Sequence, residues 1–293
     1  MIRRLKAVGL DRQEDPVLGS QKRASVLIPL TPDGCILLTQ RPSTLRTHAG
    51  EVCFPGGKQD AEDQGDDIRT ALRETREEVG LTAIEPICRF PAVESYHGLC
   101  VTPIVGRLAE NIDDVDQLQL SENEVAAVFL VPFDFFADDK NLSEPVKSIE
   151  WRGGTFDMRT YQYTYKGRTF TIWGLTAHLA HQAAFVASSS LSKGYLHRFD
   201  DDRSVWRKRY FEVTGDGMLH HYDTEREANN KQSASKKNRL SLKYCQVDVA
   251  EASPECFGFR VRALDGRIIW TLAAETEIER QQWSVSLRLI GQE

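Results

Sequence analysis

The stretch ALRETREEVGL, residues 71–81, concentrates negative charge on a short piece of predicted helix. Glu74, Glu77 and Glu78 recur at spacings of three and four residues, so their side chains project from one face of a helix. Like charges at these spacings repel each other, and a helix that carries them gains from a positive partner. Carboxylate oxygens on a rigid element suit a hard divalent cation, Mg2+ or Mn2+. An alternative stays open, in which the two arginines of the stretch neutralise these acids on a solvated surface.

A glycine turn lies upstream of the acidic stretch. In FPGGKQD, residues 54–60, Gly56 and Gly57 allow the backbone to turn sharply and to come close to another group. An acidic spacer then leads to the predicted helix at residues 68–79. The combination of turn, spacer and acidic helix favours a metal site over a solvated helix face.

The segments around this motif alternate between strand and helix patterns. Apolar runs and alternating runs, bounded by turn residues, predict strands at residues 24–30, 35–40, 101–108, 125–131, 155–165 and 168–173. An alanine-rich helix is predicted at residues 175–187. Strands interleaved with helices predict the α/β class, with a mixed sheet that is covered on both faces.

The small polar stretch ASSSLSKG, residues 187–194, separates this region from a different pattern. Short predicted strands follow at residues 194–199, 206–213, 218–223, 240–249, 256–263 and 267–274. One helix is predicted after them, at residues 276–290. We therefore predict a small antiparallel barrel or sandwich capped by a helix. The predicted domains are residues 1–187 and 193–293, joined by a linker at 188–192.

Length and composition are those of an ordinary two-domain protein. The 293 residues suffice for two domains, and no apolar run approaches the roughly 18–20 residues of a membrane helix. Six cysteines without a CxxC pair argue against zinc and against a disulfide framework, and predict reduced thiols. Residues 1–192 hold 20 Lys and Arg against 27 Asp and Glu, a net charge of −7, whereas residues 193–293 carry +1. An anionic substrate of the first half would therefore need local cations.

The first half resembles the Nudix hydrolases in its glycine turn and acidic helix. The box of that family runs G-x5-E-x7-R-E-U-x-E-E-x-G-U, where U is apolar. The fixed positions that match are Gly57, Arg73, Glu74, Glu77, Glu78, Gly80 and Leu81. Asp63 stands in place of the first glutamate, nine residues rather than seven separate it from Arg73, and Thr75 takes a usually aliphatic position.

Residues 37–58 also resemble the signature of the coenzyme A diphosphatase branch of that family, L-L-T-x-R-[SA]-x3-R-x3-G-x3-F-P-G-G. The matching residues are Leu37, Leu38, Thr39, Arg41, Arg46, Gly50, Phe54, Pro55, Gly56 and Gly57, while Pro42 replaces the small residue. The resemblance spans about residues 20–185 and implies a Nudix α/β/α sandwich with a mixed sheet.

The resemblance implies hydrolysis of a diphosphate bond with bound Mg2+ or Mn2+. Glu77 and Glu78 are then expected to bind the metal most directly, and Glu74 to share a second ion. Arg73 is expected to hold the helix to the glycine loop through a carboxylate pair. For the general base, a glutamate of the box and Glu124 are both candidates, and Glu124 has the alternative of being an ordinary exposed acid. The expected substrate-binding residues are Arg41, Arg46, His48, Gly56, Gly57 and Lys58; for Arg41 a surface cap at a strand end is the alternative.

Residues 193–291 resemble a pleckstrin homology domain in GYL at 194–196, in WRKRYF at 206–211 and in Trp283, which is expected to face the core. Members that bind phosphoinositide head groups carry a lysine near the end of the first strand and K/R-x-R on the second. Arg207 and Arg209 fit the second motif, and His197 aligns with the lysine. The expected lipid-binding residues are Lys193, Arg198, Arg207 and Arg209. A protein-binding or scaffolding module is the alternative.

The leading hypothesis is therefore a metal-dependent diphosphatase that splits coenzyme A or acyl-coenzyme A into 3′,5′-ADP and 4′-phosphopantetheine. A hydrolase of another nucleoside diphosphate derivative, such as NADH or ADP-ribose, is one alternative, and a non-catalytic adaptor on a Nudix scaffold is another. The expected partners are the small-molecule substrate and, through the second half, a phosphoinositide membrane or a protein, with no nucleic acid. The expected location is the cytoplasm, with recruitment to membranes; mitochondrion and peroxisome stay open.

Overall fold

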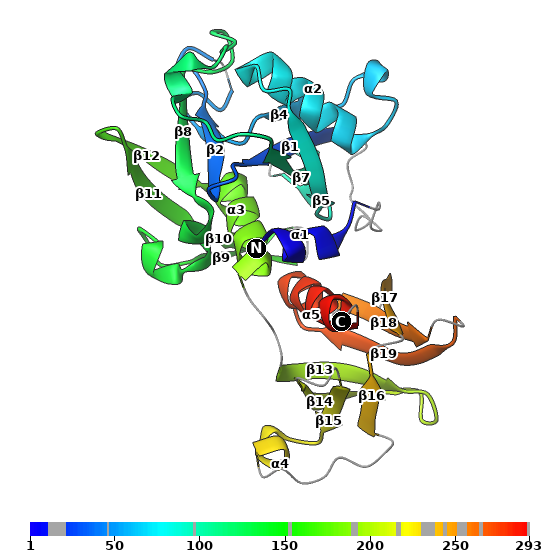
Figure 1. Cartoon of the computed structure of the whole chain (residues 1–293). Coiled ribbons are helices and arrows are strands. Elements are labelled where there is room, and N and C mark those ends of the chain that lie inside the picture. Colours follow the sequence, from blue (N-terminus) through cyan, green and yellow to red (C-terminus); the bar gives the residue numbers. More distant parts are fainter. Residues whose placement is uncertain are drawn as a thin grey trace. The chain divides into compact units, whose positions relative to one another are not determined.

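A computed structural model describes the chain over eleven segments: residues 1–10, 22–45, 47–95, 98–151, 154–188, 193–214, 218–229, 238–242, 245–250, 257–263 and 266–291. The chain divides into two compact units, Met1–Ser188 and Ser189–Glu293 (Figure 1). The linker predicted at 188–192 lies outside the described residues, apart from Ser188, which is the last residue of a helix. Arg46 and Cys256 also lie outside them.

The first unit mixes helices and strands. Its described helices are α1 (Ile2–Val8), α2 (Asp67–Val79) and α3 (Gly174–Ser188), with short 3-10 helices η1 (Ala61–Asp63), η2 (Val115–Gln117), η3 (Phe133–Ala137) and η4 (Asp139–Asn141). Its strands are β1 (Arg23–Leu30), β2 (Cys35–Gln40), β3 (Val52–Cys53), β4 (Gly56–Lys58), β5 (Ile84–Arg89), β6 (Val93–Glu94), β7 (Cys100–Leu108), β8 (Ala127–Pro132), β9 (Lys147–Trp151), β10 (Gly154–Met158), β11 (Thr160–Tyr165) and β12 (Arg168–Trp173).

One mixed sheet forms the centre of this unit. Its strand order is β3-β2-β1-β7-β5, with β4 paired to β1, β6 to β7 and β8 to β2. Strands β1 and β7 run parallel, and the other pairs of this sheet are antiparallel. Two hairpins, β9–β10 and β11–β12, form separate two-stranded sheets.

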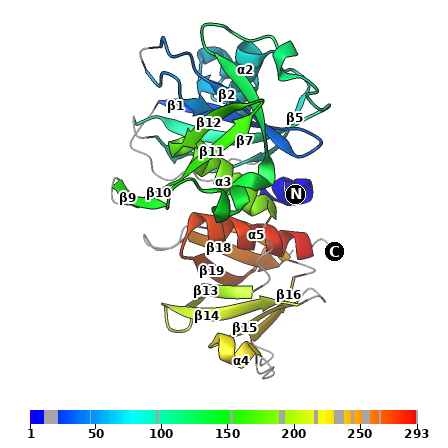
Figure 2. The ribbon, with the colours of Figure 1, turned by 90° about the vertical axis from the view of Figure 1, so that its left-hand side faces the viewer.

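Both faces of the central sheet are covered, as the sequence predicts. Leu27 lies opposite Ile104 across the β1–β7 pair, and both are fully buried with Ala71 of α2. The next pair, Ile28 and Val105, points to the other face and is also fully buried. Figures 1 and 2 show the strands of this sheet lying between α2 and α3.

Helix α2 begins and ends at residues suited to those positions. The side chain of Asp66 accepts hydrogen bonds from the backbone N–H groups of Ile68 and Arg69, which a helix leaves unsatisfied at its start. Gly80 ends the helix in the left-handed conformation, at φ 75°. The hydroxyl of Thr75 donates to the carbonyl of Ala71 at 2.7 Å, so this polar residue is satisfied at a buried position.

A buried ion pair anchors the start of α2 to the sheet. Nε and Nη2 of Arg89 in β5 both donate to Oδ2 of Asp67, at 3.2 and 2.7 Å. The side chains of Arg89 and Asp67 are 3% and 5% exposed, and Nη2 of Arg23 also lies 3.4 Å from Oδ2 of Asp67, so this carboxylate compensates two arginines in a buried setting.

The sequence patterns did not predict β5, β9 or the shortest elements, and they missed two breaks within predicted strands. Strands β3, β4 and β6 have only two or three residues, too few to show a period, and α1 has seven. The strand predicted at 155–165 is interrupted at Arg159, because its two halves pair with different partners, β9 and β12. The run predicted at 240–249 likewise contains two strands that lie at opposite ends of one sheet.

The second unit is an antiparallel sheet with a helix at its C-terminal side. Its strands are β13 (Lys193–Asp200), β14 (Val205–Val213), β15 (Met218–Tyr222), β16 (Arg239–Ser241), β17 (Cys245–Ala250), β18 (Phe257–Ala263) and β19 (Ile268–Ala274), and its helices are α4 (Glu225–Asn229) and α5 (Glu277–Gly291). The strand order is β16-β15-β14-β13-β19-β18-β17. Within the described residues β16 and β17 do not pair, so hydrogen bonds do not close the sheet into a barrel.

The core of the second unit is built around Trp283, which is 1% exposed, as its expected structural role requires. It packs with Phe211, Leu196 and Phe259 in one apolar cluster. No described helix in either unit is long and apolar enough to cross a membrane.

We expect Asp67→Ala to lower the free energy of unfolding by about 3 kcal/mol, because it removes the buried carboxylate that pairs with Arg89 and Arg23. Calorimetry on the variant measures the loss. The control is Glu85→Gln, which removes the exposed ion pair between Lys6 and Glu85, at 2.7 Å, and should change little. Equal effects of the two substitutions would contradict the assigned role of Asp67.

Candidate functional site

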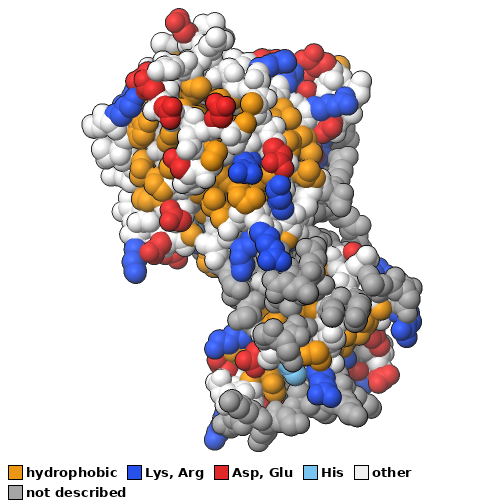
Figure 3. Space-filling view, viewed as in Figure 1, with side chains coloured by type: hydrophobic (Ala, Val, Ile, Leu, Met, Phe, Trp, Pro, Cys, Tyr) orange, Lys and Arg blue, Asp and Glu red, His pale blue; other side chains and the backbone are white. Residues whose placement is uncertain are grey.

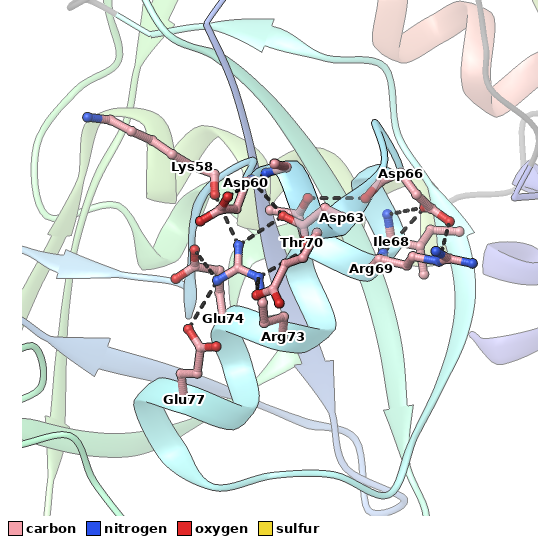
Figure 4. Close-up of polar contacts among 12 residues, drawn as sticks. Lys58, Asp60, Asp63, Asp66, Ile68, Arg69, Thr70, Arg73, Glu74 and Glu77 are labelled. Carbon is pink, nitrogen blue, oxygen red and sulfur yellow. Dashed lines mark hydrogen bonds and ion pairs between the residues drawn. The ribbon is translucent and has the colours of Figure 1, made fainter.

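The guanidinium of Arg73 organises the polar face of α2. Its Nε and Nη2 donate to the two carboxylate oxygens of Asp63 at 3.0 and 2.9 Å, and Nη2 also donates to the carbonyl of Lys58 at 3.2 Å (Figure 4). The contact with Asp63 is bidentate, which fixes direction as well as distance. Arg73 therefore ties α2 to the segment that runs from β4 into η1.

More acids surround Arg73 than one cation can neutralise. Its Nη1 lies 2.9 Å from Oε1 of Glu74 and 3.0 Å from Oε2 of Glu77, and its Nε lies 3.4 Å from Oε1 of Glu62. With Asp63, four carboxylates share one guanidinium. The Arg73 hydrogen bonds hold the pKa of Asp63 down, at about 2, so this buried acid is ionised. The cluster retains an excess of negative charge.

Glu78 lies deeper than the other acids of the helix. It is 5% exposed, and its Oε2 accepts a hydrogen bond from the backbone N–H of Gly56 at 3.3 Å. The pKa of Glu78 is raised to about 8, mainly by burial and in smaller part by the nearby charges of Glu124 and Glu74, whereas Gly56 and Arg41 act in the opposite direction. A divalent cation would relieve this conflict, because it favours the ionised carboxylate.

The two glycines of the turn allow the close approach. A Cβ on Gly57 would lie 2.4 Å from Cδ of Glu74, so a larger residue would displace that carboxylate. A Cβ on Gly56 would lie 2.4 Å from the backbone oxygen of Ser25 in β1, which cannot move easily. The backbone of β1 thus requires glycine at position 56, and glycine at position 57 leaves the Glu74 carboxylate where it is.

A loop far away in sequence brings Glu124 to the same site. The backbone N–H of Ser121 donates to the carbonyl of Glu78 at 2.9 Å, and that of Glu124 donates to the carbonyl of Ser121 at 2.9 Å. The charge of Glu124 raises the pKa of both Glu78 and Glu74, so its carboxylate lies close to theirs. Glu124 itself is exposed.

Arg41 lies on another side of Glu78. Its charge acts on the pKa of Glu78 and of Cys53, a thiol that burial raises to a pKa of about 11. Nε of Arg41 is buried and has no hydrogen-bond partner within the described part of the chain. Thr39 contacts the sulfur of Cys53 at 3.2 Å, which keeps this neutral thiol beside Arg41.

The remaining substrate-binding candidates lie less directly at this cluster. His48 has a positive φ of 56° and contacts Glu51, with Nδ1 to Oε2 at 2.7 Å. The ammonium end of Lys58 points away from Arg73 in Figure 4, although its carbonyl accepts from that arginine. Arg46 belongs to the residues that are not described.

The donor set is suitable for a divalent cation, although the ligands are not arranged as a ready cluster. Among the described residues, no group of three His, Cys, Asp or Glu side chains is placed to hold a metal ion. Glu74 and Glu77 turn instead to Arg73, and Glu77 is 47% exposed. Oxygen-only chemistry, surplus charge and the raised pKa of Glu78 fit a hard cation, which would require Glu74 and Glu77 to turn away from Arg73.

Charges on the first unit are interspersed around an apolar centre on the face shown in Figure 3. That face has no broad basic area among its described residues. An anionic substrate would therefore meet single cations such as Arg41, as the charge balance of the sequence indicates.

In the second unit, the strand register groups three arginines on one face. Arg198 lies opposite Arg207 across the β13–β14 pair, and Arg209 is two residues further along β14. His197 lies opposite Lys208 and points to the other face. Arg198, and not His197, therefore shares a face with Arg207 and Arg209.

Acids of the same unit already pair with two of these arginines. Nε of Arg207 lies 3.5 Å from Oδ2 of Asp200, and Nε of Arg209 lies 3.0 Å from Oδ1 of Asp223. Lys193 lies five residues before Arg198 on the opposite face of β13, so the structure does not bring it to the arginines.

Arg198 has structural partners of its own. Its Nη1 contacts Nε2 of His221 at 2.7 Å, and its guanidinium lies 5.0 Å from the ring centroid of Trp270. Burial lowers the pKa of His221 to about 4, and Arg198 adds to that effect, so the imidazole is neutral and accepts the hydrogen bond. Arg198 is thus held by the core of the unit.

Comparison with known proteins identifies two domains. A family model described as NUDIX domain matches residues 20–151, and one described as PH domain matches residues 191–291. The chain is 37% identical over 181 residues to the mitochondrial Nudix hydrolase 15 of Arabidopsis thaliana, covering 59% of this chain and 61% of that protein. It therefore spans less than two thirds of that relative.

Two further proteins are similar to the chain. It is 37% identical over 174 residues to the peroxisomal coenzyme A diphosphatase NUDT7 of Mus musculus, covering 57% of this chain and 71% of that protein. The carboxyl-terminal PH domain of pleckstrin is 22% identical, with a TM-score of 0.29, and the match covers 36% of this chain and 100% of that one.

We expect the raised pKa of Glu78 to make metal-free protein less stable as pH rises. The folded state holds the Glu78 proton up to about pH 8, whereas an unfolded glutamate releases it near 4.5, so stability falls between those values. Asp63 acts only below its unfolded value of 3.8, where its contribution is lost as pH falls towards 2. The measurement is the difference in unfolding free energy between the protein and Glu78→Gln, from pH 5 to 8, with a chelator present.

The difference isolates Glu78 because both proteins share the remaining titrating groups, including the histidines. It should change in favour of Glu78→Gln by a few kcal/mol across this range, since one pKa unit corresponds to about 1.4 kcal/mol. A difference that stays constant with pH would show that Glu78 titrates normally.

Proposed function

Because the chain belongs to the Nudix hydrolase family and carries a PH domain, we propose that its first unit hydrolyses the diphosphate bond of coenzyme A or acyl-coenzyme A. The products are 3′,5′-ADP and 4′-phosphopantetheine or its acyl derivative, with one water consumed. The observation that carries the proposal is the set of Glu74, Glu77 and Glu78 on one helix face, with surplus negative charge beside a glycine turn. The coenzyme A signature at residues 37–58 and the similarity to the murine coenzyme A diphosphatase support this substrate.

Nudix hydrolases generally use divalent metal ions, and we propose Mg2+ or Mn2+ here. Such an ion, when bound, lowers the pKa of a water and neutralises charge on the phosphates. Glu77 and Glu78 would hold the ion most directly, and Glu74 would share a second ion. Arg73 keeps α2 in register with the glycine turn through Asp63, and its hydrogen bond to the carbonyl of Lys58 orients that turn.

We assign acceptance of the proton of the attacking water to Glu124. It is exposed, comes from outside the helix and lies within electrostatic reach of Glu78 and Glu74. The buried Glu78 accepts from Gly56 and is better suited to hold a cation than to exchange protons with solvent. A glutamate of the box is the second candidate for the base.

Arg41 is the proposed phosphate contact. Its buried Nε has no partner among the described residues, and it lies beside Glu78 and Cys53. An unsatisfied guanidinium N–H next to a metal site suits a phosphate oxygen. The glycine turn lies beside the same carboxylate, because the backbone N–H of Gly56 donates to Glu78.

The PH domain, we propose, recruits the enzyme from the cytosol to membranes that carry phosphoinositides, through Arg207 and Arg209. Both lie on one face of β14, and both now pair with acids, which an anionic head group would replace. A protein partner is the alternative. Mitochondrion and peroxisome are the alternative locations, because one similar Nudix hydrolase is mitochondrial and the other is peroxisomal.

The substrate proposal predicts that the purified chain with Mg2+ or Mn2+ releases 3′,5′-ADP from coenzyme A. Chromatography of the products measures this against NADH and ADP-ribose at equal concentration. Faster cleavage of either nucleotide would replace the coenzyme A assignment. Activity on none of the three would favour the adaptor.

The matched variants for this experiment are Glu77→Gln and Glu62→Gln. Both carboxylates pair with Arg73, but only Glu77 belongs to the proposed metal set. We expect Glu77→Gln to lower kcat by at least about 100-fold, the usual scale for a lost electrostatic contact in the transition state, and Glu62→Gln to leave it within about 3-fold. A fully active Glu77→Gln would remove this residue from the site.

The membrane proposal predicts sedimentation of the chain with phosphatidylcholine vesicles that contain phosphatidylinositol phosphates. Arg209→Ala should lower the partition coefficient about 5-fold, the scale of 1 kcal/mol per basic residue at the surface. The control is Lys208→Ala, on the other face of β14, where Lys208 pairs with Glu275. Binding that is insensitive to Arg209→Ala would favour the protein-binding alternative.

A further inference from the structure

The turn of the β11–β12 hairpin carries a residue that its conformation disfavours. Tyr165 pairs with Arg168, so Lys166 and Gly167 form a two-residue turn, with φ angles of 47° and 79°. Positive φ at both positions favours Asn followed by Gly, because most side chains are strained there. A strained lysine calls for a contact that compensates for the strain.

That contact is a double ion pair to the loop between β7 and β8. Nζ of Lys166 lies 2.9 Å from Oδ1 of Asp114 and 2.9 Å from Oδ2 of Asp116. Asp114 also caps η2, because its side chain accepts from the backbone N–H of Asp116 at 3.2 Å. Lys166 therefore holds the two acids at the start of η2. Figure 2 turns this hairpin towards the viewer.

Apolar contacts extend the same junction. Tyr165, next to Lys166, packs against the cluster that contains Val115 of η2 and Val125 beside Glu124. The same cluster includes Val79 of α2. The loop is thus enclosed between the hairpin and the last turn of α2.

Glu124 lies at the far end of this loop. On that side the loop is attached to α2 by the hydrogen bond from Ser121 to the carbonyl of Glu78, and Val125 donates to the carbonyl of Ser121 at 2.8 Å. On the near side it is attached by Lys166. The position of the Glu124 carboxylate relative to Glu78 depends on both attachments.

We propose that Lys166 is a positioning residue, which acts through Asp114 and Asp116 to hold the Glu124 loop against α2 in the geometry that hydrolysis requires. This rests on the proposed function, because Glu124 is there the proton acceptor. Exposed ion pairs add little to global stability, so the effect is expected on the precision of the site. The hairpin, which lies outside the motif helix, thereby becomes part of the catalytic apparatus.

The test compares Lys166→Asn, Lys166→Arg and Lys147→Met. Asparagine suits the turn and removes the ammonium, arginine keeps the charge, and Lys147 is an exposed lysine whose Nζ pairs with Glu144 at 2.9 Å, away from the loop. We expect Lys166→Asn to lower kcat about 10-fold with KM within about 2-fold, as for a small misplacement of a reacting group. Lys166→Arg should recover most of that loss, and Lys147→Met should match the unchanged protein.

A second readout needs no substrate. Hydrogen exchange at the amides of Ser121 and Val125 should be faster in Lys166→Asn than in Lys147→Met. It should also speed up in the unchanged protein when the salt concentration rises from about 0.05 to 1 M, because salt screens the exposed ion pairs. A chain inactive on every diphosphate tested would overturn the proposed function. The exchange rates would still show whether Lys166 holds the Glu124 loop through Asp114 and Asp116.

The outcomes separate the alternatives. An unchanged rate of amide hydrogen exchange in Lys166→Asn would show that the contacts of Lys166 with Asp114 and Asp116 do not hold the Glu124 loop. Faster exchange with unchanged kcat would overturn the role of Lys166 in positioning Glu124. Failure of Lys166→Arg to restore kcat would do the same, because the charge would then not be the operative feature.

Discussion

The bidentate contact between Arg73 and Asp63 is the constraint on which the first unit depends. It joins the middle of α2 to η1, and the same guanidinium binds the carbonyl of Lys58 at the end of the glycine turn. The turn, the helix and the acids between them therefore have one relative placement. Asp63 replaces the glutamate usual at this position and is shorter, but the longer spacer before Arg73 lets its carboxylate reach the guanidinium.

The charge of the site follows from that contact. Asp63 accepts two of the five N–H donors of Arg73 and the carbonyl of Lys58 a third, so Glu74 and Glu77 share Nη1. Glu78 is left to the backbone of Gly56. Burial and like charge together raise the pKa of Glu78. Such an arrangement lowers the stability of the fold, and a cation that binds the surplus carboxylate oxygens would offset this loss.

Much of this was predictable from sequence because it is local. Asp66, the helix period and Gly80 specify α2, and the spacing of its glutamates specifies their common face. The contacts between distant residues were not predictable in the same way. Nothing in the sequence pairs Lys166 with Asp114, or Arg89 with Asp67, since each contact depends on the packing of separate elements. Sequence alone also did not show that Arg198 rather than His197 shares the face of Arg207 and Arg209, because a shift of one residue along a strand reverses the face.

The parallel pairing of β1 with β7 determines when the site can form. Leu27 lies beside Ile104, so the glycine turn and α2 both belong to the long connection that closes between these strands. Contacts so distant along the chain form late, because the entropy of closing the loop is lost before the strand pairing contributes its favourable free energy. On the ribosome, α2 is therefore synthesised before β7 can complete the sheet that it packs against, and before the loop that carries Glu124.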